Sequence, residues 1–309
     1  MMTHTQIARA FPTLVAATLS LASPAAAQST KNPENLVVST PTASGFAPVN
    51  GLQFYYEVHG TGKPLVLLHG GVSATEAFGG NLAELARGRQ VIAVHLQGHG
   101  RTRDIDRPLR YETMADDVAA LIAHLGLEKA DVMGYSLGGG VALQAAIRHP
   151  ASVDRLVVVS GPPLTREGWY PEVRAAFEQM PANAPHIAAN VRQSPLAQLH
   201  PEVDWESLFR KIGEQNSRDD DWSAEVAALR VPAMFVYADA DAVRPEHVVE
   251  IYRALGGGER DAGLDGAGQP VARLAIIPGA THYDILSTTL VAQLAAQFLD
   301  APLPQASAR

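Results

Sequence analysis

The chain has 309 residues, of which 47% are hydrophobic and 18% are charged, and this composition suits one large domain with a sizeable buried core. The formal net charge is −8 and Lys and Arg form no cluster, which excludes recognition of nucleic acid or of an anionic membrane surface through a basic patch. The absence of cysteine excludes disulfide bonds, thiol catalysis and thiolate metal sites. We therefore expect a small-molecule partner, whereas the composition predicts no particular oligomeric state.

Residues 1–27 have the order of segments that is typical of a secretory signal peptide. Arg9 is the only Lys, Arg, Asp or Glu in this stretch, an apolar run covers residues 11–21, and three alanines occupy positions 25–27. A helix that spans a bilayer needs about 20 apolar residues, and prolines and serines interrupt this run. We therefore expect cleavage after Ala27 and a secreted or periplasmic protein without a stable membrane anchor.

The mature sequence starts with a segment of weak pattern. Residues 28–47 are rich in Ser, Thr, Pro and Asn and lack periodicity, so they are interpreted as an N-terminal arm or a leader strand. Residues 51–60 alternate apolar and polar side chains and lead into the turn "GTGKP", which predicts an antiparallel hairpin at the edge of a sheet.

Buried strands and amphipathic helices then alternate along the chain. This alternation predicts βαβ units, a mostly parallel central sheet flanked by helices, and therefore the α/β class. Residues 164–230 break the rhythm with helical periodicity alone, and they predict an inserted helical segment. The predicted strands cover 64–70, 90–96, 129–135, 153–161, 231–239 and 272–279, and the predicted helices cover 112–126, 138–150, 245–256 and 288–300.

The stretch "MGYSLGGGVALQAA", residues 133–146, contains a serine with glycines two positions away on both sides. Gly134, Ser136 and Gly138 fit G-x-S-x-G, in which the serine adopts strained backbone angles and larger neighbours would collide. The motif follows a predicted strand and opens a predicted helix, which is the context that a nucleophilic serine on a tight turn requires. Ser136 is therefore the candidate nucleophile.

A serine nucleophile needs a base, an acid that orients the base, and donors for the oxyanion. His282 lies just after the last predicted strand, and Asp241 lies just after the strand that covers 231–239. Asp239 is a second candidate for the acid, because residues two apart on an extended segment point the same way. The small residues of "LLHGG" allow a backbone N–H to face a reacting carbonyl oxygen.

These motifs together resemble the α/β-hydrolase fold family, from about residue 48 to residue 300. The resemblance implies a core built from residues 48–163 and 231–303, with a helical cap inserted at 164–230. Whether Trp169, Tyr170 and Trp205 line a substrate pocket or attach this cap to the core stays open.

The resemblance also implies roles for individual residues. Ser136 is then the nucleophile, His282 the base and Asp241 the orienting acid. The acid of the family stands four residues before a proline that opens the next helix, so Pro245 selects Asp241 over Asp239. The oxyanion hole is implied to consist of the backbone N–H groups of Gly71 and Leu137.

One segment departs from the family pattern D-x-R-G-x-G-x-S. In "HLQGHGRT", His95 and Gln97 stand where many relatives carry an acidic and a basic residue, which affects the placement in a subfamily more than catalysis. His69 and His99 lie in turns of the family pattern, and we expect them to bond to backbone groups rather than to accept a substrate proton.

The sequence therefore predicts a serine hydrolase that cleaves a carboxylic ester or a related acyl bond. Amide, carbon–carbon and perhydrolysis chemistry stay open because the same three residues support them, and a binding protein without turnover is the alternative from another class. No H-E-x-x-H motif or complete dinucleotide fingerprint occurs, so no metal and no cofactor are implied.

Overall fold

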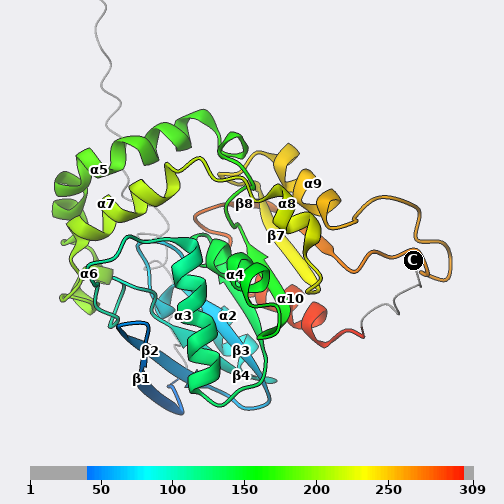
Figure 1. The fold of residues 1–309 in the computed structure, drawn as a ribbon, viewed down its shortest axis with the longest axis horizontal. Coiled ribbons are helices and arrows are strands. Elements are labelled where there is room, and N and C mark those ends of the chain that lie inside the picture. Colours follow the sequence, from blue (N-terminus) through cyan, green and yellow to red (C-terminus); the bar gives the residue numbers. More distant parts are fainter. Residues whose placement is uncertain (1–39, 303–309) are drawn as a thin grey trace, which may run out of the picture.

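The computed structural model describes residues 40–302, so the predicted signal peptide and most of the predicted arm lie outside the described residues. Within that range the strands form one sheet of eight strands in the order β1-β2-β4-β3-β5-β6-β7-β8 (Figure 1). The strands from β4 to β8 along this order are parallel, and β1 and β2 are antiparallel at one edge, which confirms the predicted mostly parallel sheet. The strands are β1 (Ala43–Val49), β2 (Leu52–His59), β3 (Lys63–Leu68), β4 (Arg89–Val94), β5 (Ala130–Tyr135), β6 (Val153–Val159), β7 (Ala233–Ala240) and β8 (Arg273–Thr281).

The edge hairpin differs from its prediction. β2 pairs with the preceding β1 through a two-residue loop, Asn50 and Gly51, both of which have positive φ as a tight turn matching the strand twist requires. The prediction of a hairpin turn at residues 60–64 is therefore wrong. After these residues the chain crosses to β3, which pairs with β4 and β5 and not with β2. The strand also begins at Ala43, inside the predicted arm of 28–47. The Asn-Gly pair was the sequence signal for this turn.

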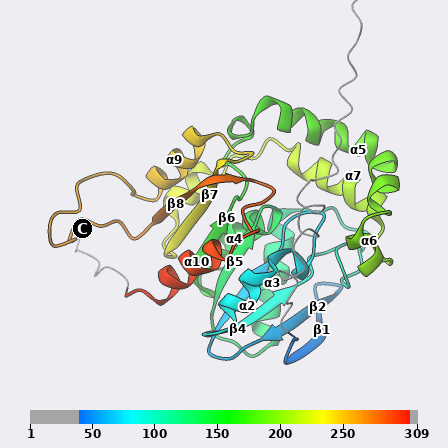
Figure 2. The ribbon, with the colours of Figure 1, turned by 180° about the vertical axis from the view of Figure 1, so that it is seen from behind.

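Helices cover both faces of the sheet, each over its own apolar cluster. α3 and α4 pack with α9 on one face and lie in front of the sheet in Figure 1, whereas α2 and α10 cover the other face, which Figure 2 shows. The hydrophobic side chains of the central strands supply both clusters, as expected for parallel strands buried on two sides. The helices on the two faces are α2 (Gly80–Leu85), α3 (Tyr111–His124), α4 (Leu137–Arg148), α9 (Pro245–Ala254) and α10 (Leu290–Asp300). The sequence did not predict α2.

The segment between β6 and β7, which we call the cap segment (residues 164–230), contains helices and no strand of the sheet. α5 and α7 pack side by side, and with α6 they lie at one end of the core, whereas α8 packs beside α9 (Figure 1). Trp169 and Trp205 are buried, and Tyr170 is exposed. The helices are α5 (Pro171–Val191), α6 (Pro195–Leu199), α7 (Trp205–Asn216) and α8 (Ser223–Ala228).

α7 approaches the loops that follow β3 and β4. A Cβ atom built on Gly71 would lie 3.4 Å from Ile212 Cδ1, and one built on Gly98 would lie 3.6 Å from Leu208 Cδ1. None of the helices in the described range 40–302 has the length and apolar character that crossing a membrane requires.

Candidate active site

Ser136 occupies a strained turn between β5 and α4. Its φ is +52°, a region that costs a residue with a side chain about 1 kcal/mol or more, and its N–H donates to Val159 O at 2.9 Å. A Cβ atom on Gly134 would lie 2.0 Å from Gly138 O, and one on Gly138 would lie 2.4 Å from Leu68 O. Both glycines of the motif are therefore required by the close approach of β3, β5 and α4.

The side chains of Ser136 and His282 are in hydrogen-bond contact although 146 residues separate them in the sequence. Ser136 Oγ lies 3.0 Å from His282 Nε2, and His282 sits in the turn that follows β8. The Tyr135 hydroxyl donates to the backbone oxygen of His282 at 2.6 Å, which fixes the position of this turn over the end of β5.

Asp241 holds the other side of the His282 ring. His282 Nδ1 lies 2.9 Å from Asp241 Oδ1, so the carboxylate selects the tautomer that carries the proton on Nδ1 and leaves Nε2 free to accept a proton from Ser136. The N–H groups of Ala242 and Ala238 donate to the Asp241 carboxylate at 2.8 and 3.1 Å. Burial raises the pKa of Asp241, but the hydrogen bonds and the charge of His282 outweigh it, and the pKa is lowered from its ordinary value.

Asp239, the rival candidate, points elsewhere. Both of its carboxylate oxygens accept the N–H of Gly279, at 2.9 and 3.0 Å, which links the end of β7 to β8. Asp239 is exposed, whereas Asp241 is buried and contacts His282. Asp239 therefore joins two neighbouring strands and does not contact the ring of His282.

The two N–H groups predicted for an oxyanion hole lie next to the serine. A Cβ atom on Gly71 would lie 3.8 Å from Leu137 Cβ, and one on Gly70 would lie 3.2 Å from Ser136 Cβ. Within residues 40–302 neither Gly71 N–H nor Leu137 N–H donates a hydrogen bond, so no acceptor of the described chain occupies either group.

Two neutral histidines hold the loop that carries Gly71. His69 Nε2 accepts the N–H of Leu96 at 3.1 Å, and its Nδ1 lies 2.7 Å from Gly70 O. His99 Nε2 accepts the N–H of Val72 at 3.3 Å, and its Nδ1 lies 2.9 Å from Gln97 O. Both rings bond to backbone groups, as the sequence predicted.

A further histidine, His95, packs with these two rings in the core. The ring centroids of His69 lie 4.9 Å from His99 and 6.1 Å from His95, and all three side chains are at most 1% exposed. Burial lowers the pKa of His95 and of His99 to about 4, and that of His69 well below its ordinary value. The three rings are therefore neutral in the folded protein at neutral pH.

We expect these histidines to make the protein sensitive to mild acid. The unfolded chain binds protons on His95 and His99 near pH 6.5 and the folded chain only near pH 4, so the stability that these two residues contribute is full above about pH 6.5 and falls as the pH drops towards 4. The expected loss at pH 5 is about 2 kcal/mol for each of these two histidines, and the lowered pKa of His69 acts in the same direction. Urea unfolding at pH 7, 6 and 5 measures it.

The control for this prediction is a pair of matched substitutions. His99→Asn removes one titrating ring and is expected to flatten the dependence on pH, whereas the same change at the exposed His124 is expected to leave it unaltered. An equal free energy of unfolding for the unmodified protein at pH 7 and pH 5 would contradict the prediction.

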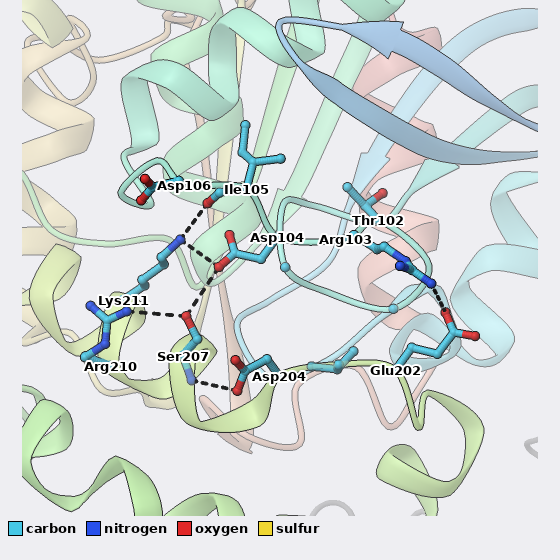
Figure 3. A pocket seen from close by; sticks show the side chains of 13 residues that line it. Thr102, Arg103, Asp104, Ile105, Asp106, Glu202, Asp204, Ser207, Arg210 and Lys211 are labelled. Atoms are coloured by element: carbon cyan, nitrogen blue, oxygen red, sulfur yellow. Dashed lines mark hydrogen bonds and ion pairs between the residues drawn. The ribbon is translucent and has the colours of Figure 1, made fainter.

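A cavity lies between the loop that follows β4 and the residues at the start of α7 (Figure 3). It has a volume of about 660 Å³ and is lined by residues within 98–106 and 202–211, so Ser136, Asp241 and His282 do not line it. In its wall, Lys211 Nζ donates to Asp104 Oδ2 at 2.6 Å and to two backbone oxygens. Within residues 40–302 no group of three or more His, Asp or Glu side chains is placed to hold a metal ion.

Comparison with known proteins identifies the family of the chain. Residues 63–201 match the profile of a family described as the alpha/beta hydrolase fold. The chain is 32% identical to the AB hydrolase superfamily protein YisY of Bacillus subtilis over 62% of its own length and 79% of that protein. It is 35% identical to the putative carbamate hydrolase RutD of a Caulobacter species, over 51% of this chain and 58% of that protein.

Solved structures show the same fold at low sequence identity. The structure of the carboxylesterase CesB from Bacillus subtilis superposes with a TM-score of 0.69 and 19% identity, covering 90% of this chain and 97% of the other. At this level of identity the likeness concerns the fold alone. With the identity to YisY, these matches show that the chain belongs to the alpha/beta hydrolase family.

Proposed function

We propose that this protein is a serine hydrolase that cleaves a carboxylic ester, or a related acyl bond, of a small molecule through an acyl-enzyme intermediate. The observation that carries the proposal is the row of hydrogen bonds from Ser136 Oγ to His282 Nε2 and from His282 Nδ1 to Asp241 Oδ1. A base in contact with the hydroxyl and an acid in contact with the base are what activation of a serine requires.

The steps follow from these contacts. Ser136 Oγ attacks the carbonyl carbon while His282 Nε2 takes the hydroxyl proton, and Asp241 stabilises the imidazolium that forms. The N–H groups of Gly71 and Leu137 receive the negative charge that develops on the carbonyl oxygen. His282 then gives its proton to the leaving alcohol, and a water molecule activated by His282 hydrolyses the acyl-enzyme.

Other acyl chemistry uses the same residues. The similarity to a putative carbamate hydrolase makes a carbamate the second candidate substrate class, and amides and carbon–carbon bonds stay possible because the first step is the same attack on a carbonyl. A binding protein without turnover is disfavoured, because a site that no longer reacts has no reason to keep the strained serine in contact with its base.

A panel of substrates tests the proposal. Protein that begins at residue 28 is given chromogenic esters of increasing acyl length, lactones, carbamates and anilides, and product is followed from the first turnover. We expect a burst of alcohol equal to the enzyme concentration with at least one ester, as an accumulating acyl-enzyme gives. If no member is cleaved, and a fluorophosphonate fails to label Ser136, the proposal is wrong.

We also propose that residues 1–27 direct export and are removed. The segment lies outside the described residues, and its support is the charged start, the apolar run and the three alanines at 25–27. Intact-mass spectrometry of the protein from its native host is expected to give an N-terminus at Gln28 in the extracytoplasmic fraction. Recovery of the chain with residues 1–27 attached would contradict this proposal.

A further inference from the structure

A second serine, Ser160, stands in the site without a role in the steps above. It follows β6 as Ser136 follows β5, and the N–H of each donates to the adjacent strand: Ser136 to Val159 O at 2.9 Å and Ser160 to Val236 O at 2.8 Å. Both serines have positive φ, +52° for Ser136 and +45° for Ser160. The two residues therefore occupy equivalent positions at the carboxyl ends of neighbouring strands.

The side chain of Ser160 is directed to the acid of the site. Ser160 Oγ donates to Asp241 Oδ2 at 2.5 Å, a short distance of the kind that a hydroxyl makes to an ionised carboxylate, and Ser160 is fully buried. Asp241 Oδ1 contacts His282 Nδ1, so the two oxygens of this carboxylate serve different partners. The hydroxyl also fixes the rotation of the carboxylate about its own axis, because it holds one oxygen while His282 takes the other.

The backbone conformation of Ser160 indicates that the hydroxyl has a use. Glycine occupies positive φ at less cost than any residue with a side chain, and strained residues persist where the surroundings require them. Glycine at this position would lack the hydroxyl, and the one hydrogen bond that the side chain of Ser160 makes goes to Asp241.

We propose that Ser160 is a positioning residue of the triad, which holds the Asp241 carboxylate in the orientation that His282 needs and completes its hydrogen bonding. The proposal rests on the proposed function of Ser136, His282 and Asp241. Four adjacent strands then each contribute one residue to a row of hydrogen bonds at their carboxyl ends. These residues are Ser136 after β5, Ser160 after β6, Asp241 after β7 and His282 after β8.

Ser160→Gly separates a positioning role from a merely structural one. Glycine relieves the positive φ while it removes the hydroxyl, so we expect a melting temperature close to that of the unmodified protein. We expect kcat to fall by about 10- to 100-fold, the range for a lost hydrogen bond to a charged group, with KM for the best ester within about twofold. A loss confined to kcat marks a change in the reacting groups and not in substrate binding.

Two further variants keep the test decisive. Ser160→Ala removes the hydroxyl and keeps the Cβ atom and the strained φ, so its kcat is expected to fall as far as that of Ser160→Gly. It also replaces Ser160→Gly if the glycine variant does not fold. Ser207→Ala is the matched control, because Ser207 Oγ also donates to an aspartate, Asp104 Oδ2, at 3.3 Å, away from the triad. We expect this control to retain full kcat.

The outcomes distinguish this inference from the proposed function. If the unmodified protein cleaves esters and folded Ser160→Gly keeps kcat within about threefold, or if Ser160→Ala does so where the glycine variant does not fold, the positioning role is overturned while the assignment of Ser136 stands. If the unmodified protein cleaves no substrate of the panel, the proposed function fails first and the positioning role fails with it.

Discussion

Ser136→Ala is expected to abolish hydrolysis while the fold is preserved. The substitution removes the only atom that attacks the substrate, and loss of the nucleophile of a serine hydrolase costs on the order of 10⁶ in kcat. Alanine keeps the Cβ atom of Ser136 and the same strained φ of +52°, so the packing around the turn between β5 and α4 has no reason to change. Steady-state kinetics with the best ester of the panel, and a melting curve beside the unmodified protein, measure both effects.

The purity of the Ser136→Ala preparation limits how small a residual activity the assay can detect. Contaminating esterases from the expression host set the lowest activity that can be trusted, so the variant is titrated with a fluorophosphonate before the assay. The assignment of Ser136 is refuted if the folded variant keeps more than a few per cent of the activity of the unmodified protein and the residual activity follows the purified chain.

Asp241→Asn is expected to lose about 10⁴ in kcat with nearly normal melting. The amide of asparagine has one donor and one acceptor, so the ring of His282 no longer has a carboxylate that selects the Nδ1–H tautomer and stabilises the imidazolium. Asp239→Asn is the matched control from the same strand, because it keeps an oxygen for the N–H of Gly279 and lies outside the row of hydrogen bonds. We expect this control to retain most of its turnover.

The kcat values of the two variants together decide which aspartate is the acid of the site. Should Asp239→Asn be inactive and Asp241→Asn active, the acid of the site moves to Asp239 while Ser136 and His282 keep their roles. The comparison is made with kcat at a pH above 7, where the buried histidines around the loop of Gly71 are neutral in both variants.

The elements of the sheet were predictable from local sequence. Runs such as those in β3 and β6 are apolar throughout because both faces of a parallel strand are buried, and helices between them recur at a regular spacing. The six residues of α2 give too little periodicity to predict a helix, and two glycine-containing stretches, Asn50-Gly51 and residues 60–64, compete for the hairpin turn in the local sequence.

The candidate nucleophile and base were equally visible in the sequence. Ser136 lies in a motif whose glycines have no room for a Cβ atom, which would lie 2.0 or 2.4 Å from a backbone oxygen, and such a requirement leaves a local pattern in the sequence. His282 and Asp241 were inferred from their places after strands and from the order of the three residues in the family, and the structure brings their side chains together.

The sequence by itself determined the α/β class, the position of the strained serine and the order of the strand ends, because these depend on neighbours along the chain. Only the tertiary structure decided between Asp239 and Asp241, because both lie at the end of β7. The carboxylate of Asp239 bonds to the N–H of Gly279, whereas that of Asp241 bonds to His282 and Ser160. Ser160 had no pattern of its own to mark it. Its contact with Asp241 joins residues 81 positions apart, and such a contact forms only when β6 and β7 lie side by side in the sheet.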